Sequence, residues 1–301
     1  MRILVLGRDG QIGRALVDQA WPPDFQPVWA GRNEADVTDA TALTDLLTRS
    51  APAMVVNCAA YTQVDKAETD PETAFAANAQ APATIAAYCR SARIPLLHFS
   101  TDYVFDGSKD GPYTEDDPMA PLGVYGASKA AGEDAIRTSG ADHWIWRTAW
   151  VFGPHRANFV RTMLRAAMTN DRLSVVDDQI GTPAPTPGLA AAVVTLIDRW
   201  RHDRTRAPYG TYHVSGDEPV SWHGLATAVF EAAESVAPDW PRPELTAIPT
   251  TQWPTPARRP ANSRLAGARA ASALGIPPIA WRSALPPIVA AIIDDLRETS
   301  P

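Results

Sequence analysis

The sequence predicts an α/β protein built on a doubly wound parallel sheet, with helices on both faces and a smaller C-terminal lobe. Two observations lead to this prediction. Short aliphatic runs alternate with longer helical patterns through the first half of the chain, as in successive βαβ units. The length of 301 residues lies where single hydrophobic cores stop growing and chains divide into two lobes.

Each expected strand is a short apolar run that a helical pattern follows. The strands are expected at Arg2–Leu6, Pro27–Ala30, Ala53–Asn57, Pro95–Ser100 and His143–Arg147. The helices between them are expected at Gln11–Ala20, Ala40–Ser50, Pro71–Ser91 and Tyr125–Thr138. Right-handed crossovers place the carboxyl ends of such strands at one edge of the sheet, so we expect ligands to bind there.

The second half of the chain is richer in proline, with 18 of the 28 prolines after residue 150. Two proline-rich stretches, Thr182–Pro187 and Pro249–Pro260, are predicted to be extended, rigid connections. Helices are expected near Asn158–Thr169, Trp222–Glu234 and Trp281–Arg297. We therefore expect residues 1–150 to form one domain, to which part of 173–200 returns, and residues 151–301 to form mainly the smaller lobe.

Composition argues against several classes of partner. With 27 Lys and Arg against 34 Asp and Glu, the formal charge of −7 repels phosphate backbones and anionic membranes, so neither nucleic acid nor a membrane is expected. The longest apolar stretch, Leu189–Ile197, is too short to cross a bilayer, and no signal-peptide pattern opens the chain. Cys58 and Cys89 lie in apolar surroundings, which favours buried thiols over a disulfide or a metal pair. We expect a cytoplasmic protein.

A glycine-rich turn joins the first strand to the first helix. It reads Gly7-Arg8-Asp9-Gly10-Gln11-Ile12-Gly13, with glycines at every third position. Glycines permit a tight turn and close backbone approach, and the helix N-terminus offers free N–H groups to a pyrophosphate. The pattern is typical of a Rossmann-type dinucleotide site, although the same turn also occurs without a ligand.

The end of the second strand bears on the choice of nicotinamide cofactor. An acidic residue there normally binds the adenosine 2′-hydroxyl, but this chain has Gly31-Arg32, and arginine suits a 2′-phosphate. We expect NADPH, with NADH also accepted; Arg32 is alternatively a solvated loop charge. In the following Ala35–Asp39, a carboxylate and an apolar residue are placed to flank an adenine, while Asp39 alternatively caps the helix at Ala40.

The clearest catalytic pattern combines a strand end with a helix start. Ser100-Thr101-Asp102 closes the fourth strand, and Tyr125 and Lys129, four residues apart, share a face of the next helix. An ammonium near a phenol favours the phenolate, so we expect Lys129 to lower the pKa of Tyr125 and make it a usable general acid. A Thr101 hydroxyl at the same carbonyl is expected to stabilise its developing charge. A Tyr-x-x-x-Lys pair alone is more often an exposed helix pair.

These residues resemble an extended short-chain dehydrogenase/reductase, and specifically the dTDP-4-dehydrorhamnose reductase (RmlD) family. The resemblance covers nearly the whole chain. It extends through the segments at 10–13, 56–68, 100–105, 125–129, 147–151, 178–181 and 254–263. The segment Thr101–Phe105 and the Arg258-Arg259-Pro260 sequence are the most discriminating of these.

The resemblance implies NAD(P)H-dependent reduction of the C4 keto group of dTDP-4-dehydro-L-rhamnose to dTDP-L-rhamnose. It implies Thr101, Tyr125 and Lys129 as the catalytic set. With the glycine turn and Arg32 added, the expected cofactor-binding residues are Gly7, Gly10, Gln11, Ile12, Gly13, Arg32, Asp36, Val37, Ala59, Ala60, Tyr61, Thr62, Tyr125 and Lys129. The expected substrate-binding residues are Thr101, Asp102, Tyr125, Trp150, Arg258 and Arg259.

Some of these assignments have ordinary alternatives. Trp150 offers an aromatic face to a pyranose ring, or is a core tryptophan among ten in the chain. Arg258 and Arg259, with Arg264, suit a nucleotide diphosphate, or pair with local acids as surface arginines do. Pro183–Gly188 has no carboxylate where some family members bridge a metal with glutamates, so we expect no metal and a monomer or weak homodimer.

Two competing functions remain open on the sequence alone. A reductase or epimerase of another nucleotide 4-keto sugar has the same Thr-Tyr-Lys set, so only the sugar-binding lobe distinguishes it. A non-catalytic dinucleotide-binding regulatory subunit has the fold without the reaction. The complete set of Thr101, Tyr125 and Lys129 favours an enzyme.

Overall fold

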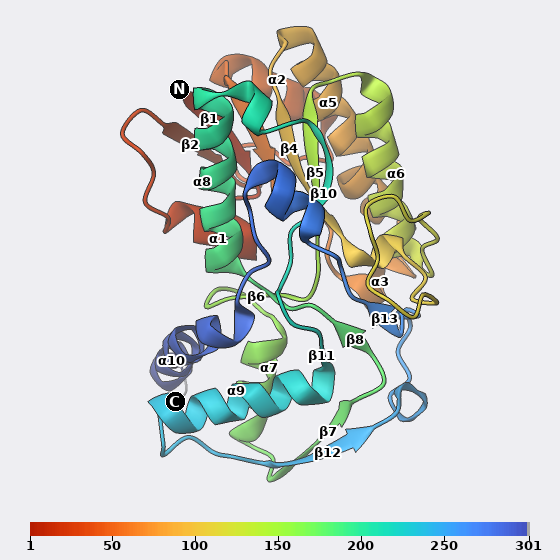
Figure 1. The fold of residues 1–301 in the computed structure, drawn as a ribbon, viewed down its shortest axis with the longest axis vertical. Helices are drawn as coiled ribbons and strands as arrows, with labels where there is room; N and C mark the ends of the chain where they lie inside the picture. The colour runs from red at the N-terminus through yellow and green to blue at the C-terminus, as the bar shows by residue number, and fades with distance from the viewer. Residues whose placement is uncertain (300–301) are drawn as a thin grey trace.

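The computed structural model describes residues 1–299 and is built around a six-stranded, wholly parallel sheet in the order β10-β5-β4-β3-β1-β2 (Figure 1). The strands are β1 (Arg2–Leu6), β2 (Gln26–Ala30), β3 (Met54–Asn57), β4 (Leu96–Thr101), β5 (His143–Thr148) and β10 (Gly210–His213). The direction in which strands are added reverses between β1 and β3, which is where doubly wound folds bind ligands.

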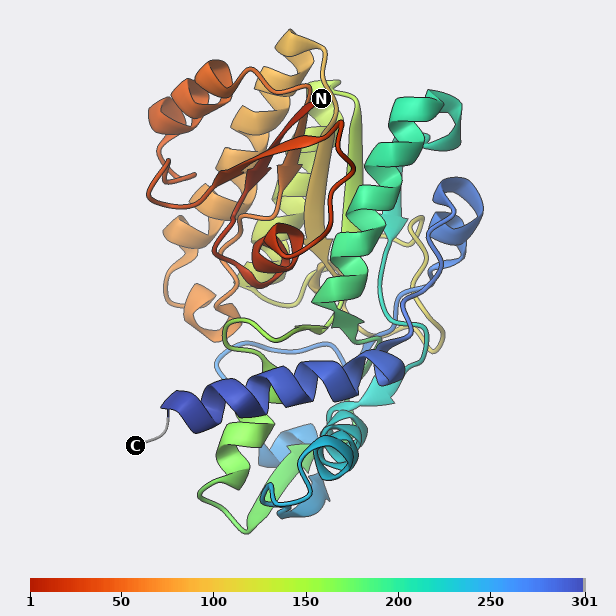
Figure 2. The same cartoon turned by 90° about the vertical axis from the view of Figure 1, so that its left-hand side faces the viewer.

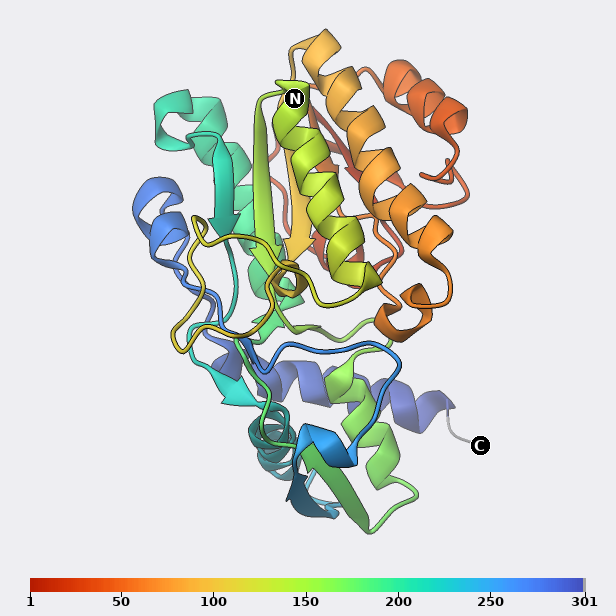
Figure 3. The same cartoon turned by 90° about the vertical axis from the view of Figure 1, so that its right-hand side faces the viewer.

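Helices cover both faces of the sheet. Figure 2 shows α1 (Gln11–Val17) and α8 (Thr186–His202) on one face, and Figure 3 shows α2 (Ala40–Ser50), α5 (Ala81–Ala92) and α6 (Val124–Ser139) on the other. Alternation along β1 divides the core accordingly. Ile3 and Val5 pack in the cluster that contains α8, whereas Leu4 and Leu6 pack in the cluster that contains α2 and α5.

The smaller lobe lies below the sheet in Figure 1 and has its own core. Phe152, Leu164, Val229 and Val289 are all buried within that core. Three helices supply most of it: α7 (Phe159–Ala167), α9 (Trp222–Val236) and α10 (Trp281–Thr299). Its short strands are β6 (Val151–Phe152), β7 (Arg172–Val176), β8 (Ile180–Gly181), β9 (Ala184–Pro185), β11 (Val220–Ser221), β12 (Glu244–Ile248) and β13 (Asn262–Ser263).

The five expected strands are confirmed to within one or two residues at their ends. The expected helix at Pro71–Ser91 is instead α4 (Pro71–Phe75), a π-helical segment (Ala76–Gln80) and α5, and α3 (Val64–Ala67) was not expected. The strand β10 was not expected, and the helix α8 was not named as an element although part of 173–200 was expected to return to this domain. Together with a π-helical turn at Ala270–Leu274, they pack against the sheet core.

The expectation that Thr182–Pro187 is wholly extended is wrong at its last two residues. Thr186 and Pro187 open α8. Proline is well tolerated in the first turn of a helix, because backbone N–H groups there have no partner within the helix and the φ of proline already suits a helix. In Pro249–Pro260, a 3₁₀ turn occupies Thr250–Gln252, and the rest has no regular structure apart from bends. Among residues 1–299, every helix is too short or too polar to span a bilayer.

Candidate active site

A cavity of about 500 Å³ opens at the carboxyl edge of the sheet, between the sheet and the smaller lobe. Its lining comes from the glycine turn, from the ends of β3, β4 and β5, from the start of α6 and from the lobe. Residues expected from the sequence that line it are Gly10, Gln11, Ile12, Ala60, Thr62, Thr101, Asp102, Tyr125, Lys129, Trp150 and Arg259. The cavity thus lies where the strand order predicts a ligand.

The glycine turn lies close beneath the segment that follows β3. Gly7 has φ +83°, and a Cβ there would lie 2.6 Å from the Ala59 backbone nitrogen. Gly13 is equally constrained, because a Cβ would lie 2.1 Å from the Gly7 carbonyl oxygen. At Gly10, the N-cap of α1, the nearest atom to a Cβ is that same carbonyl oxygen at 3.3 Å. Gly7 and Gly13 therefore shape the turn, and Gly10 faces the cavity.

The loop after β2 is more acidic than the sequence motif suggested. The Arg32 side chain is 86% exposed, and its Nε lies 3.7 Å from the Asp36 carboxylate. Glu34 accepts a hydrogen bond from the Gly31 N–H at 2.7 Å and pairs with Arg8 at 3.3 Å. Asp39 caps α2 by accepting from Thr41 and Ala42, so the capping interpretation of Asp39 is confirmed.

The segment after β3 presents small side chains to the cavity. Cys58, Ala60 and Thr62 line it, and burial raises the pKa of the Cys58 thiol. Ala59 and Tyr61 do not line it: the Tyr61 backbone is bonded to the buried Asn78 amide, and its hydroxyl points to Asp70. Val37 packs at the edge of the core beneath α2, away from the cavity lining.

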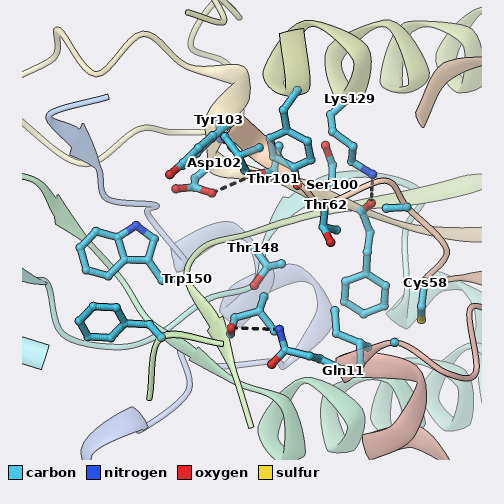
Figure 4. A pocket seen from close by; sticks show the side chains of 18 of the residues that line it. Gln11, Cys58, Thr62, Ser100, Thr101, Asp102, Tyr103, Lys129, Thr148 and Trp150 are labelled. Carbon is cyan, nitrogen blue, oxygen red and sulfur yellow. Dashed lines mark hydrogen bonds between the residues drawn. The ribbon is translucent and has the colours of Figure 1, made fainter. Parts of the chain in front are cut away.

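Thr101 and Asp102 are buried together at the end of β4. The Thr101 hydroxyl donates to Asp102 Oδ1 at 2.9 Å (Figure 4), and it accepts from the Tyr103 N–H at 3.2 Å. Burial raises the pKa of Asp102 to about 7, and the nearby Ser263 and Thr101 hydroxyls oppose that shift. Asp102 Oδ2 is buried without a partner, so this carboxyl has capacity left for a ligand.

Tyr125 and Lys129 both line the cavity from the same face of α6. The expectation that Lys129 lowers the pKa of Tyr125 is wrong: burial raises that pKa to about 12, and the nearby Thr101 hydroxyl only partly opposes the shift. The Lys129 ammonium is directed elsewhere, because Nζ donates to the Phe99 carbonyl at 2.6 Å (Figure 4). Burial also lowers the pKa of Lys129 to about 8, so the amine loses its proton about one pH unit above neutral.

Trp150 lines the cavity, but neither of its faces is free. Trp222 stacks on one face with ring centroids 3.4 Å apart and planes 4° apart. A Cβ at Gly181 would lie 2.4 Å from the Trp150 ring, which places Gly181 against the opposite face. The indole Nε1 donates to Ser263 at 3.2 Å. A sugar in this cavity therefore meets the edge of Trp150 unless Trp222 moves.

The arginine loop reaches the cavity through Arg259. Its guanidinium pairs with Asp65 at 2.8 Å, which is the local acidic partner that the alternative interpretation expected. Arg258 lies outside the main cavity, beside a small pocket next to Tyr103 and Tyr125. Arg264 is held by Asn262 and by the Asp110 carbonyl. Only Arg259 of the three is placed to touch a ligand in the main cavity.

The sequence analysis did not assign nine of the lining residues to the site: Cys58, Val64, Phe99, Ser100, Tyr103, Thr148, Val151, Phe159 and Trp222. Phe159 and Trp222 lie on the lobe and are read from sequence as core aromatics. Thr148 ends β5, and its strand-end position was an available signal. Its Oγ1 is buried without a partner, as is Oε1 of Gln11.

These unpartnered atoms, in a cavity that Gly10 lines, fit a bound dinucleotide, because buried polar atoms need hydrogen-bond partners. Gly10, Gln11 and Ile12 would contact its pyrophosphate, and Lys129 would contact its ribose. Among residues 1–299 no group of three or more His, Cys, Asp or Glu side chains is arranged to hold a metal ion.

Comparison with known proteins identifies close relatives along the full length. The family model described as RmlD substrate binding domain matches residues 1–293. A dTDP-4-dehydrorhamnose reductase of Sinorhizobium fredii is 40% identical over 265 residues, covering 88% of each chain. A crystal structure of such a reductase from Clostridium acetobutylicum has a TM-score of 0.88 at 33% identity, covering 99% of this chain and 100% of that one.

A third relative bears on the cofactor. The structure of dTDP-4-dehydrorhamnose reductase from Bacillus anthracis in complex with NADP has a TM-score of 0.85 at 30% identity. The alignment covers 95% of this chain and 98% of that chain. The resemblance drawn from the strand-end and Tyr-x-x-x-Lys motifs is thereby confirmed, and the chain belongs to the RmlD family.

Proposed function

We propose that this protein is an NADPH-dependent oxidoreductase that reduces the C4 keto group of dTDP-4-dehydro-L-rhamnose to give dTDP-L-rhamnose. The observation that carries the proposal is the meeting of Thr101, Tyr125 and Lys129 in one cavity beside the glycine turn. The names of the relatives, and the NADP bound in one of them, support this reaction and this cofactor.

The cofactor, when bound, supplies a hydride to C4. Tyr125 is the proton donor in the proposal: its high pKa keeps the phenol protonated, and it gives the proton to the oxygen that becomes the C4 hydroxyl. Thr101 is proposed to hold that oxygen in hydrogen-bond reach of Tyr125. Lys129 orients the ribose and, when protonated, stabilises the phenolate that remains.

Asp102 is proposed to orient the substrate. At neutral pH its carboxyl is divided between the protonated and ionised forms, so Oδ2 is able to donate to or accept from a sugar hydroxyl. Arg259 is proposed to bind the diphosphate through its guanidinium, either by breaking the ion pair with Asp65 or by donating hydrogen bonds to Asp65 and the diphosphate at once. The nucleotide sugar would then lie between the sheet edge and the lobe.

Turnover of NADPH and of NADH at 340 nm, with dTDP-4-dehydro-L-rhamnose generated in situ, tests the proposal. The Tyr125→Phe variant is expected to lose about 10²- to 10⁴-fold in turnover while binding NADPH normally. Tyr209→Phe, on the far side of the sheet beside Trp200, is the matched control and is expected to leave turnover unchanged.

Full activity of Tyr125→Phe would refute the assignment of the proton donor. No turnover by the wild-type protein, despite tight NADPH binding, would point to another nucleotide 4-keto sugar. Recovery of a stoichiometric protein partner together with the lack of turnover would point to a regulatory subunit.

We further propose that the protein works in the cytoplasm as a monomer or weak homodimer without a metal. Both cysteines are free in the structure, which suits a reducing compartment. Sedimentation at several concentrations tests the oligomeric state, and turnover after treatment with a chelator tests the metal. Loss of activity on chelation, restored by a divalent cation, would contradict the latter.

A further inference from the structure

A fully buried histidine, His98, touches Lys129 from within the sheet. Alternation along β4 turns Leu97 and Phe99 to the α8 side and His98 to the α6 side. His98 Nε2 lies 3.3 Å from Lys129 Nζ. The same Nζ donates to the Phe99 carbonyl at 2.6 Å, so two consecutive residues of β4 hold the amine.

The neighbouring strand determines which ring nitrogen of His98 carries the proton. Asn57 lies opposite His98 in the β3–β4 register. The Ala59 backbone N–H donates to Asn57 Oδ1 at 3.1 Å, which fixes the orientation of the side-chain amide. The amide therefore turns its NH₂ group to His98, with Nδ2 at 3.0 Å from Nδ1. Nδ1 must accept, so the proton of the neutral ring is on Nε2.

The ring is held neutral by its surroundings. Burial, together with the nearby charge of Lys129, holds the pKa of His98 well below its usual value. The other titratable groups that act on Lys129 are Glu133, one turn along α6, and the Cys58 thiol at the end of β3. Glu133 favours the charged amine, whereas the Cys58 thiol stays neutral because burial raises its pKa, and neither lies on the strand that carries His98.

This tautomer makes Nε2–H a donor aimed at Nζ. A neutral amine has a lone pair that accepts such a bond, whereas an ammonium has three N–H groups and no acceptor. Moving the ring proton to Nδ1 does not remove the contact between two donors, because Nδ1–H would then face the Asn57 NH₂ group. Either tautomer thus leaves one donor facing another donor while Lys129 is charged, which costs free energy at a buried site.

We propose that His98 is a positioning residue that acts through Lys129: its Nε2–H fixes the amine next to the Phe99 carbonyl and favours the neutral over the charged amine. Its consequence for turnover rests on the proposed function, since a neutral Lys129 cannot stabilise the phenolate of Tyr125. The pH at which kcat falls on the alkaline side would then depend on the Nε2–H group of His98.

Lysine NMR tests the proposal without any turnover. The chain has only three lysines, Lys66, Lys109 and Lys129, so protein labelled with ¹³C at lysine Cε gives three signals. Lys66→Arg and Lys109→Arg assign them. In the wild-type protein the Lys129 signal is expected to titrate near pH 8. In His98→Gln, whose amide can turn an oxygen to Nζ, the midpoint is expected to rise by about one pH unit.

A matched control is His213→Gln, because His213 is an equally buried histidine of the same sheet that contacts Arg147 and the Tyr113 carbonyl instead of Lys129. It is expected to leave the Lys129 midpoint unchanged. An unchanged midpoint in His98→Gln, or an equal shift in His213→Gln, would overturn the proposal. If neither variant folds, ¹⁵N NMR of the wild-type imidazoles decides, since a His98 ring protonated at Nδ1 would also overturn it.

Turnover provides the functional readout. In His98→Gln, the alkaline limb of kcat is expected to move up by the same pH interval, with the KM for NADPH changed less than kcat. A Lys129 shift seen by NMR in a protein without reductase activity would leave the inference standing and refute the proposed reaction instead. If the NMR midpoint of Lys129 rises in His98→Gln but the alkaline limb of kcat stays at the wild-type pH, the ionisation of Lys129 does not set that limb.

Discussion

The Glu133 carboxylate on α6 holds the Arg147 guanidinium on β5, with Nη2 at 2.7 Å and Nε at 3.0 and 3.2 Å. Both side chains are buried, at 0% and 2% exposure. Ser100 on β4 also donates to Glu133, at 2.5 Å. This pair therefore ties α6, which carries Tyr125 and Lys129, to the two strands that end at the cavity.

Removal of one member of this pair leaves a buried charge without a partner. We predict that Glu133→Ala lowers the free energy of unfolding by about 3–5 kcal/mol, measured by urea denaturation. Glu231→Ala, on α9 of the lobe and exposed, is expected to change it by less than about 0.5 kcal/mol. Equal stability of the two variants would show that the pair contributes little.

The same pair predicts a loss of stability in acid. Bonds from Arg147, and the charges of Arg147 and Arg137, hold the pKa of Glu133 below its usual value even though burial opposes them. A lowered folded-state pKa gives stability that is present above the unfolded value of 4.5 and is lost as the pH falls through the folded value. We expect the free energy of unfolding to fall below pH 4.5, and to fall less steeply in Glu133→Gln.

Asp102 predicts the opposite dependence near neutral pH. Its folded pKa of about 7 lies above the unfolded value of 3.8, so its contribution is full below pH 3.8 and is lost as the pH rises through 7. Between pH 6 and pH 8 this one group lowers the free energy of unfolding by about 1.4 kcal/mol. Urea denaturation of Asp102→Asn at both pH values is expected to show a drop smaller than the wild-type drop by that amount. Identical drops would contradict the assignment.

The glycine turn offers a sharp test of backbone geometry. Gly7→Ala is expected to lower the free energy of unfolding by about 2 kcal/mol or more, because of its positive φ and the contact with Ala59. NADPH binding is expected to weaken as well, since the turn shifts. Gly111→Ala is the control, because no atom lies within 4 Å of the Cβ it would gain. NADPH affinity is measured by calorimetric titration. Equal affinities of the Gly7→Ala and Gly111→Ala variants would show that the turn is not part of the cofactor site.

Cofactor preference is tested at Arg32. If its guanidinium binds the 2′-phosphate, Arg32→Ala is expected to raise the KM for NADPH about tenfold, equivalent to about 1.4 kcal/mol, and to leave the KM for NADH unchanged. Arg172→Ala, an arginine of similar exposure that pairs with Glu244 on the lobe, is the control. An equal rise for both cofactors would exclude a role in phosphate recognition and direct attention to Arg8, which pairs with Glu34.

Much of the site could be predicted from sequence because its parts are local. Gly10, Gln11 and Ile12 follow one strand, and Thr101 and Asp102 lie at the end of another. Tyr125 and Lys129 share one turn of a helix. The helical period and the positions at strand ends therefore suffice to place these residues at the carboxyl edge of the sheet. The lobe residues Phe159 and Trp222 could not be predicted in the same way. They reach the cavity only through packing between segments distant in the chain.

The parallel strands β1 to β5, the glycine turn and the family could be inferred from the sequence alone, since each depends on local patterns and motifs. The folded structure was needed to show that β10 completes the sheet, that α8 is the part of 173–200 that packs on it, and that Trp150 is covered on both faces. It also decided that burial raises the pKa of Tyr125 and that His98 faces Lys129. These properties arise from desolvation and from contacts between distant segments, which no window of sequence contains.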